Sequence, residues 1–263
     1  NTKIKNKKME ENIHVLKAGA TDIVDELFTK KNIVVELLDL KNINNGLYQH
    51  SVNVMIHSVI MGISVGLNKI ELSKLALAAV LHDFGIVFMP TEIINKKGKL
   101  TSKEYRIVQE HSKKGFDFLR DKLNLESTIR IAVLEHHEKY DGSGYPDGKK
   151  ADETHLYSRI ISIANKFDAL TSDRIYRKAS PVGEALEYIM GGGGTYFDPE
   201  LTKTFIKHIN PYPINTLIKL NTEDIGAVIK VNDNIFTRPV VKIIAGKNKG
   251  EEINLLETKN IVI

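Results

Sequence analysis

The run His-His-Glu-Lys-Tyr-Asp-Gly-Ser-Gly-Tyr-Pro, from His136 to Pro146, constrains this chain more than any other stretch. Two adjacent histidines close an apolar pattern of helical type, and a tight loop with two glycines and a proline follows. Imidazole is the commonest metal ligand among side chains. Neighbouring residues on a helix point about 100° apart, so two successive ligands suit a metal near the helix end. A solvated histidine pair that caps a helix is the ordinary alternative.

A second histidine ends another apolar helical pattern. His82-Asp83 follows the stretch from Leu75 to Leu81, and Gly85 stands at the position expected for a helix C-cap. A histidine joined to a carboxylate offers two further ligand types. The repetition of this arrangement favours a metal centre over unrelated surface histidines.

Two more histidines are candidates. His50 lies near the start of a helix predicted from Gly46 to Leu67, and His57 lies two turns later on the same face. We interpret His57 as a core histidine. The pair Thr101 and Glu104 is typical of a capping box, and the helix that it opens is expected to carry His111.

Composition excludes several classes of site. The chain has no cysteine, so metal ligands must be histidine and carboxylate, which suits iron or manganese better than structural zinc. The net charge of +4 is mild, and no long basic run indicates a nucleic-acid polymer as partner. No apolar run approaches the roughly 20 residues of a membrane span, and no signal peptide is seen. We therefore expect a cytoplasmic protein.

The chain divides into three predicted parts. Residues 1–44 read as a linker and a helical extension, with helices expected over Ile13–Phe28 and Ile33–Leu40. Residues 45–210 form the part that carries the histidines. Residues 211–263 contain short β-branched runs between turns, which predicts a small antiparallel β appendage with a structural role. The first residue is Asn, so we expect the chain to continue from an upstream segment.

In its motifs the sequence resembles a known family, the HD-GYP phosphodiesterases, which are HD-superfamily metal-dependent hydrolases of cyclic di-GMP. The matching stretches run from Leu81 to Gly85, from His136 to Pro146, from Asn165 to Arg177 and from Gly194 to Pro199, in the order and spacing of the family. The resemblance spans residues 45–208. It implies a mainly α fold, an HD-type helical bundle, with the β appendage following it.

The resemblance also implies two divalent metal ions, with iron or manganese favoured. Each ion would be held by its own group of ligands. Asp83 would lie between the two ions, because a carboxylate has two oxygens to share. These groups are His50, His82 and Asn165 for the first ion, and His111, His136 and His137 for the second.

Further residues match positions near the substrate in the family. Gly144 and Tyr145 belong to the loop that flanks it, and Asp168 is assigned the orientation of a water or a ligand. Arg174 and Arg177 occupy positions that bind phosphate, which suits the planar guanidinium group. Salt bridges on the surface are the ordinary alternative for the two arginines.

Three positions depart from the family pattern. Asn165 replaces an aspartate that ligates the first metal, and Ile86 replaces the lysine that follows His-Asp-x-Gly. Gly46 stands where members with a third metal carry an acid. If the lost contacts contributed about 2–4 kcal/mol to transition-state stabilisation, the rate would fall by roughly two to three orders of magnitude.

Two functional hypotheses remain open on the sequence alone. The first is a phosphodiesterase that converts cyclic di-GMP to the linear dinucleotide or GMP. The second is a degenerate domain that binds metal or cyclic dinucleotide and signals with little turnover, in concert with an upstream sensor. A purely structural helical adaptor fits the retained histidines less well. The helical extension is compatible with a homodimer.

Overall fold

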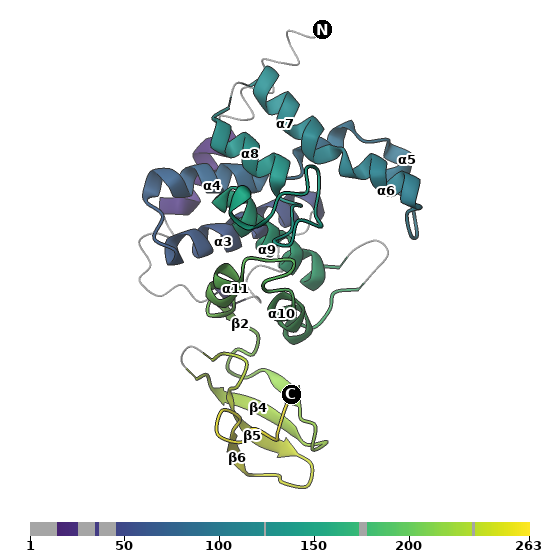
Figure 1. The fold of residues 1–263 in the computed structure, drawn as a ribbon. Coiled ribbons are helices and arrows are strands. Elements are labelled where there is room, and N and C mark those ends of the chain that lie inside the picture. Colours follow the sequence, from purple (N-terminus) through teal and green to yellow (C-terminus); the bar gives the residue numbers. More distant parts are fainter. Residues whose placement is uncertain (1–14, 26–34, 37–45, 124, 174–177, 233–234) are drawn as a thin grey trace. The chain divides into compact units, whose positions relative to one another are not determined.

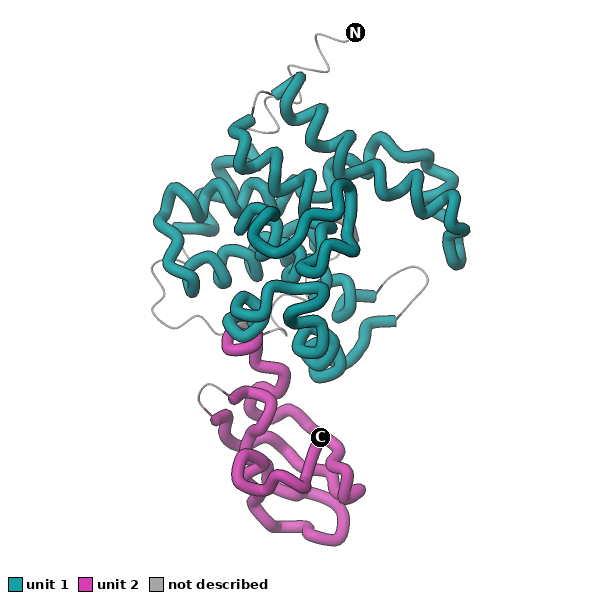
Figure 2. The backbone as a smooth tube through the Cα atoms, in the orientation of Figure 1, with its two compact units in different colours: residues 1–33, 43–205 teal, residues 34–42, 206–263 magenta. Residues whose placement is uncertain are grey.

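The computed structural model describes residues 15–25, 35–36, 46–123, 125–173, 178–232 and 235–263. The chain forms two compact units, residues 1–33 with 43–205 and residues 34–42 with 206–263 (Figure 2). The first unit is helical and the second contains an antiparallel sheet, as predicted. Among the described residues, no helix combines the length and the apolar character needed to cross a bilayer.

The first unit is a bundle of helices (Figure 1). Residues 15–25 are also helical, in agreement with the predicted N-terminal helix. The α-helices of the bundle and the two short 3-10 helices are α3 (Gly46–Ser64), α4 (Lys69–Leu81), η1 (Phe84–Phe88), α5 (Thr91–Ile94), α6 (Ser102–Gln109), α7 (His111–Asp121), α8 (Ser127–Glu135), η2 (Ala151–Glu153), α9 (Leu156–Thr171), α10 (Val182–Gly191) and α11 (Pro199–Ile206).

Helices α4 and α9 supply much of the core. A helix that is apolar on most sides must be covered on most sides, and α4 buries Leu72, Leu75 and the run from Ala76 to Ala79. Helix α9 buries four apolar side chains and Phe167 in the same way. Helix α3 packs against both of them, so its inward face, which carries His50, is directed at α9.

The helix starts follow local capping chemistry. Helix α4 begins at Asn68, whose side chain accepts hydrogen bonds from the N–H groups of Ile70 and Glu71, while Glu71 accepts from the Asn68 N–H. The capping box of Thr101 and Glu104 is confirmed at the start of α6.

Three helix ends position histidines of the chain, and the structure corrects the expectations for His111 and for Gly85. Helix α6 ends at Gln109, and His111 is instead the first residue of α7. Helix α8 ends at Glu135, so the histidine pair lies at and just beyond its C-cap. His82 is itself the C-cap of α4, and Gly85 lies inside η1 rather than in a left-handed cap.

The second unit is a small sheet with its own core. Four antiparallel strands in the order β3 (Leu217–Lys219), β4 (Ile225–Lys230), β5 (Val240–Ala245) and β6 (Glu252–Asn254) carry alternate side chains into it. The strands β3 to β5 were predicted, and β6 was not. The buried side chains are Ile218, Leu220, Val228, Val241, Ile243 and Leu255.

A short parallel pair joins two distant segments within this second unit. Strand β1 (Val35–Glu36) pairs with β2 (Ile209–Asn210). The helix expected over Ile33–Leu40 is therefore wrong at these two residues, because backbone pairing with β2 overrides the local helical pattern. The rest of that stretch lies outside the described residues.

Candidate metal centre

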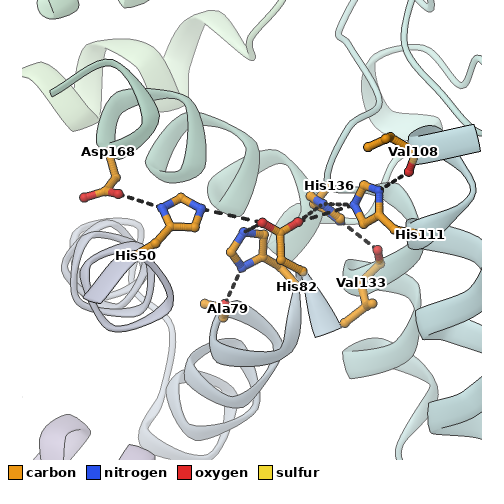
Figure 3. A network of polar contacts seen from close by, with 9 residues as sticks. His50, Ala79, His82, Val108, His111, Val133, His136 and Asp168 are labelled. Atoms are coloured by element: carbon orange, nitrogen blue, oxygen red, sulfur yellow. Dashed lines mark hydrogen bonds and ion pairs between the residues drawn. The ribbon is translucent and has the colours of Figure 1, made fainter. Parts of the chain in front are cut away.

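Five histidines and one aspartate converge between α3, α4, α7 and the end of α8. Figure 3 shows four of these histidines, His50, His82, His111 and His136. The ligand atoms of the five histidines and the aspartate form two groups, in each of which the atoms lie within 4.8 Å of one another. Asp83 belongs to both. The groups are His50, His82 and Asp83, and Asp83, His111, His136 and His137. The structure thus brings together the histidines that the sequence assigned to each of two metals.

Asp83 divides its two oxygens between the groups. Its Oδ2 lies 3.4 Å from Nε2 of His82 and 3.7 Å from Nε2 of His50. Its Oδ1 lies 3.3 Å from Nε2 of His111 and 3.6 Å from Nε2 of His136. One carboxylate that faces two imidazole groups with different oxygens has the arrangement of a bridging ligand.

Backbone carbonyls fix the tautomer of three histidines. Nδ1 of His82, His111 and His136 each lies 2.7 Å from the carbonyl oxygen three residues earlier, at Ala79, Val108 and Val133. A carbonyl can only accept, so each Nδ1 donates and each Nε2 carries the lone pair. Such a hydrogen bond orients a ring as a metal ligand. All three Nε2 atoms point toward Asp83.

His50 is fixed by a side chain instead. Its Nδ1 lies 2.6 Å from Oδ2 of Asp168, which is 3% exposed on α9. Asp168 therefore contacts the ring of the first group, one turn after Asn165 along the same helix. Asn165 is half-buried. The structure thus assigns Asp168 to orienting His50, and the ligand role of Asn165 stays a prediction.

The Nε2 atoms of the histidines lie close together with few donors to satisfy them. His50 Nε2 and His82 Nε2 are buried without a hydrogen-bond partner. Nε2 of His111 lies 3.3 Å from Nε2 of His136, although both rings donate through Nδ1, so two lone pairs face each other. Buried acceptors without a donor and opposed lone pairs are unfavourable unless a cation lies between them. The donor set therefore fits divalent metal ions.

The charge states of His136, His137 and Asp83 suit metal binding, because ligands must be neutral imidazole and ionised carboxylate. Burial lowers the pKa of His136 to about 4. Burial, with the neighbouring His136 and His111, holds the pKa of His137 well below its usual value. Burial alone would raise the pKa of Asp83, but the charge of His82 and hydrogen bonds from three histidines outweigh it and hold this pKa well below its usual range. At His82, burial lowers the pKa, yet Asp83 and the Ala79 carbonyl raise it overall.

The Gly-Tyr-Pro loop folds back onto the second group. The ring of Tyr145 stacks on His137, with centroids 4.7 Å apart and planes 23° from parallel. Gly144 permits this approach, because a Cβ there would lie 2.4 Å from the Lys139 nitrogen and 2.5 Å from the His137 carbonyl oxygen. His137 and Tyr145 are half-buried, and the Asp83 side chain is 26% exposed, so solvent reaches the centre beside these three residues.

Two glutamates that the sequence analysis did not single out hold this loop. Glu138 accepts hydrogen bonds from the backbone N–H groups of Asp147 and Gly148. Glu135 is 2% exposed, contacts the Lys149 ammonium at 2.5 Å and accepts from the His155 N–H at 2.9 Å. In the sequence, the only sign of their role is their position directly before and directly after the histidine pair.

The remaining predicted residues lie as follows. His57 is a core residue, as predicted, and packs edge-on against Phe167 and Phe205 with its pKa lowered by burial to about 4. Ile86 is half-buried in η1, three residues after Asp83. Arg174 and Arg177 lie outside the described residues, so their phosphate role stays a prediction.

Family models match both units. A model described as "HD domain" matches residues 36–201, and one described as "KOW domain associated with HD domain" matches residues 217–263. The first covers more than half of the chain. The match begins in the segment that holds β1 and ends inside α11, so all the histidines of the metal centre lie within it.

Curated relatives of this chain are named as phosphodiesterases of cyclic dinucleotides, either cyclic di-GMP or 3'3'-cGAMP. A cyclic di-GMP phosphodiesterase of Pseudomonas aeruginosa is 32% identical over 86% of this chain and 55% of its own length. Another, of Thermotoga maritima, is 32% identical over 70% of this chain and 52% of its own length. The chain thus spans about half the length of these relatives. An HD-GYP-type protein of Bdellovibrio bacteriovorus shares the fold, with a TM-score of 0.62 and 20% identity over 74% of this chain and 63% of that one.

Proposed function

Because the chain belongs to the HD domain family, of the HD-GYP type, we propose that it is a metal-dependent phosphodiesterase that hydrolyses cyclic di-GMP. The product would be the linear dinucleotide or GMP. The observation that supports the proposal most strongly is the position of Asp83, whose two oxygens face two separate groups of histidines. Relatives that share the sequence pattern are named for this activity.

We propose that His50, His82 and Asp83 hold one divalent ion and that Asp83, His111, His136 and His137 hold the other. Iron or manganese suits a site of imidazole and carboxylate ligands. Such a pair of ions would supply an activated water and charge stabilisation for the phosphate oxygens. Asp168 keeps the His50 ring in place, and the three backbone carbonyls do the same for His82, His111 and His136.

The substrate would approach at the solvent-accessible side of the centre. The partly exposed residues on this side of the centre are Asp83, His137 and Tyr145. A phosphodiester that enters here would therefore contact both the Gly-Tyr-Pro loop and the bridging carboxylate. Gly144 keeps the loop close to the end of α8. Arg174 and Arg177 remain the proposed phosphate ligands on sequence grounds. The upstream sensor and the cytoplasmic location expected from the sequence remain predictions.

A second function is supported by two residues. Asn165 and Ile86 replace an aspartate and a lysine of the family pattern, which favours a domain that binds metal and cyclic dinucleotide with little turnover. The two ligand groups favour catalysis, because every histidine in them is present and contacts a partner that orients it. For His137 this partner is the Tyr145 ring.

Restoring the family residues separates these two functions. We expect the wild-type protein loaded with Mn²⁺ or Fe²⁺ to form linear dinucleotide or GMP, and Asn165→Asp with Ile86→Lys to raise turnover by less than about tenfold, a change of about 1.4 kcal/mol. Product chromatography under anaerobic conditions measures both. A gain of 10²-fold or more over a nearly inactive wild type would instead identify a degenerate binding domain.

A further inference from the structure

We propose that Asn53 is a positioning residue for one metal ion only, the ion of the group formed by His50, His82 and Asp83. Asn53 acts through Asp168, which contacts both Asn53 and the metal ligand His50. The inference rests on the proposed metal site, but not on the identity of the substrate.

The chain of hydrogen bonds has a defined direction. Gln49 Nε2 donates to Asn53 Oδ1 at 2.7 Å, and Asn53 Nδ2 donates to Asp168 Oδ1 at 2.7 Å. The other oxygen of Asp168 lies 2.6 Å from Nδ1 of His50. Because a carboxylate only accepts, His50 donates through Nδ1 and presents the lone pair of Nε2 to Asp83.

The spacing along α3 explains why these residues can act together. Gln49 and His50 precede Asn53 by four and three residues, so all three side chains project from neighbouring positions of successive turns. Asp168 stands opposite them on α9. Asn53 is 7% exposed and Asp168 is 3% exposed, so water is a poor substitute for the amide as a donor to the carboxylate.

The first group differs from the second in His50, since His82 is also oriented by a backbone carbonyl. In the second group, His111 and His136 are held by backbone carbonyls, which no substitution can remove. In the first group, His50 depends wholly on side chains for its orientation. A carboxylate that rotates away from His50 would release the ring, and Asn53 occupies the oxygen of Asp168 that His50 does not use. Ser172 Oγ also donates to this oxygen, at 3.2 Å, a longer contact.

The test is calorimetric titration of the metal-free full chain with Mn²⁺. For the wild type we expect two binding steps. For Asn53→Ala we expect one step to weaken by about 10–100-fold, the range found when a partner of a metal-bound histidine is removed, and the other step to change by less than about twofold. Asn53→Asp keeps the shape of the side chain but replaces the donor by a second acceptor beside Asp168. It should weaken the same step at least as much.

Val54→Ala is the structural control. Val54 is the next residue of α3 and fully buried, so this change leaves a cavity and lowers stability without removing a hydrogen bond of the chain. Both Mn²⁺ steps should stay within about twofold of the wild type. The proposal is overturned if Asn53→Ala and Asn53→Asp leave both steps unchanged, if they weaken both steps equally, or if the wild type binds fewer than two ions. Two intact Mn²⁺ steps without hydrolysis of cyclic di-GMP would contradict the proposed function and leave the role of Asn53 standing.

Discussion

Asp83→Asn is expected to lower cyclic di-GMP turnover by at least roughly 10³-fold, or about 4 kcal/mol of activation free energy. The amide keeps the size of the carboxylate but loses its charge and one of its two acceptor oxygens. Those oxygens face different histidine groups, at 3.4 Å from His82 and 3.3 Å from His111. The metal content should therefore fall from two ions to one or none, measured by elemental analysis alongside the rate.

Asp117→Asn provides the matched control on α7. Asp117 is 41% exposed and pairs with Arg120 at 3.1 Å, three residues along the same helix. Exposed pairs of this kind contribute about 0–1 kcal/mol, so its loss should leave metal content and turnover unchanged. If Asp83→Asn retained two ions and more than a tenth of the wild-type rate, Asp83 would not bridge the two groups.

Gly85→Ala is expected to destabilise the first unit by about 3 kcal/mol and to weaken metal binding at the second group. A Cβ at this position would lie 1.9 Å from the carbonyl oxygen of His111 and 2.8 Å from the nitrogen of Gly115. Both contacts are with backbone, so η1 and α7 must separate, and overpacking of this kind is costly. Urea unfolding gives the free energy, and Mn²⁺ titration gives the affinity.

Gly19→Ala is the control for this substitution. Gly19 lies in the helix over residues 15–25 and is exposed, and a Cβ there would meet nothing within 4 Å. Alanine in an exposed helix interior should raise the free energy of unfolding by up to about 1 kcal/mol. A Gly85→Ala protein as stable as the wild type would show that η1 and α7 can separate freely, contrary to the close approach described.

The sequence predicted the ligands better than the elements that carry them. His82, His111 and His136 come together as expected because helical periodicity places each of them on an inward face. The elements differ in detail, since His111 opens α7 and His136 follows α8. Such helix ends are set by caps and by contacts with other helices, which a periodic pattern does not contain.

Partners from distant parts of the chain were harder to predict. Nothing in the order of residues indicates that Asp168 meets His50, or that Asn53 meets Asp168, because these contacts need α3 and α9 to pack side by side. Gly85 was read as a helix cap because of its position after His82. Its actual role is to let the backbone of η1 approach His111, which is a tertiary contact.

We propose that this chain holds two metal ions around Asp83. The most direct measurement is the metal content of the full chain, purified without oxygen and reconstituted with Fe²⁺ or Mn²⁺, determined by elemental analysis after removal of free ions. The arrangement of the two histidine groups predicts two ions per chain. One ion or none under saturating metal would contradict it.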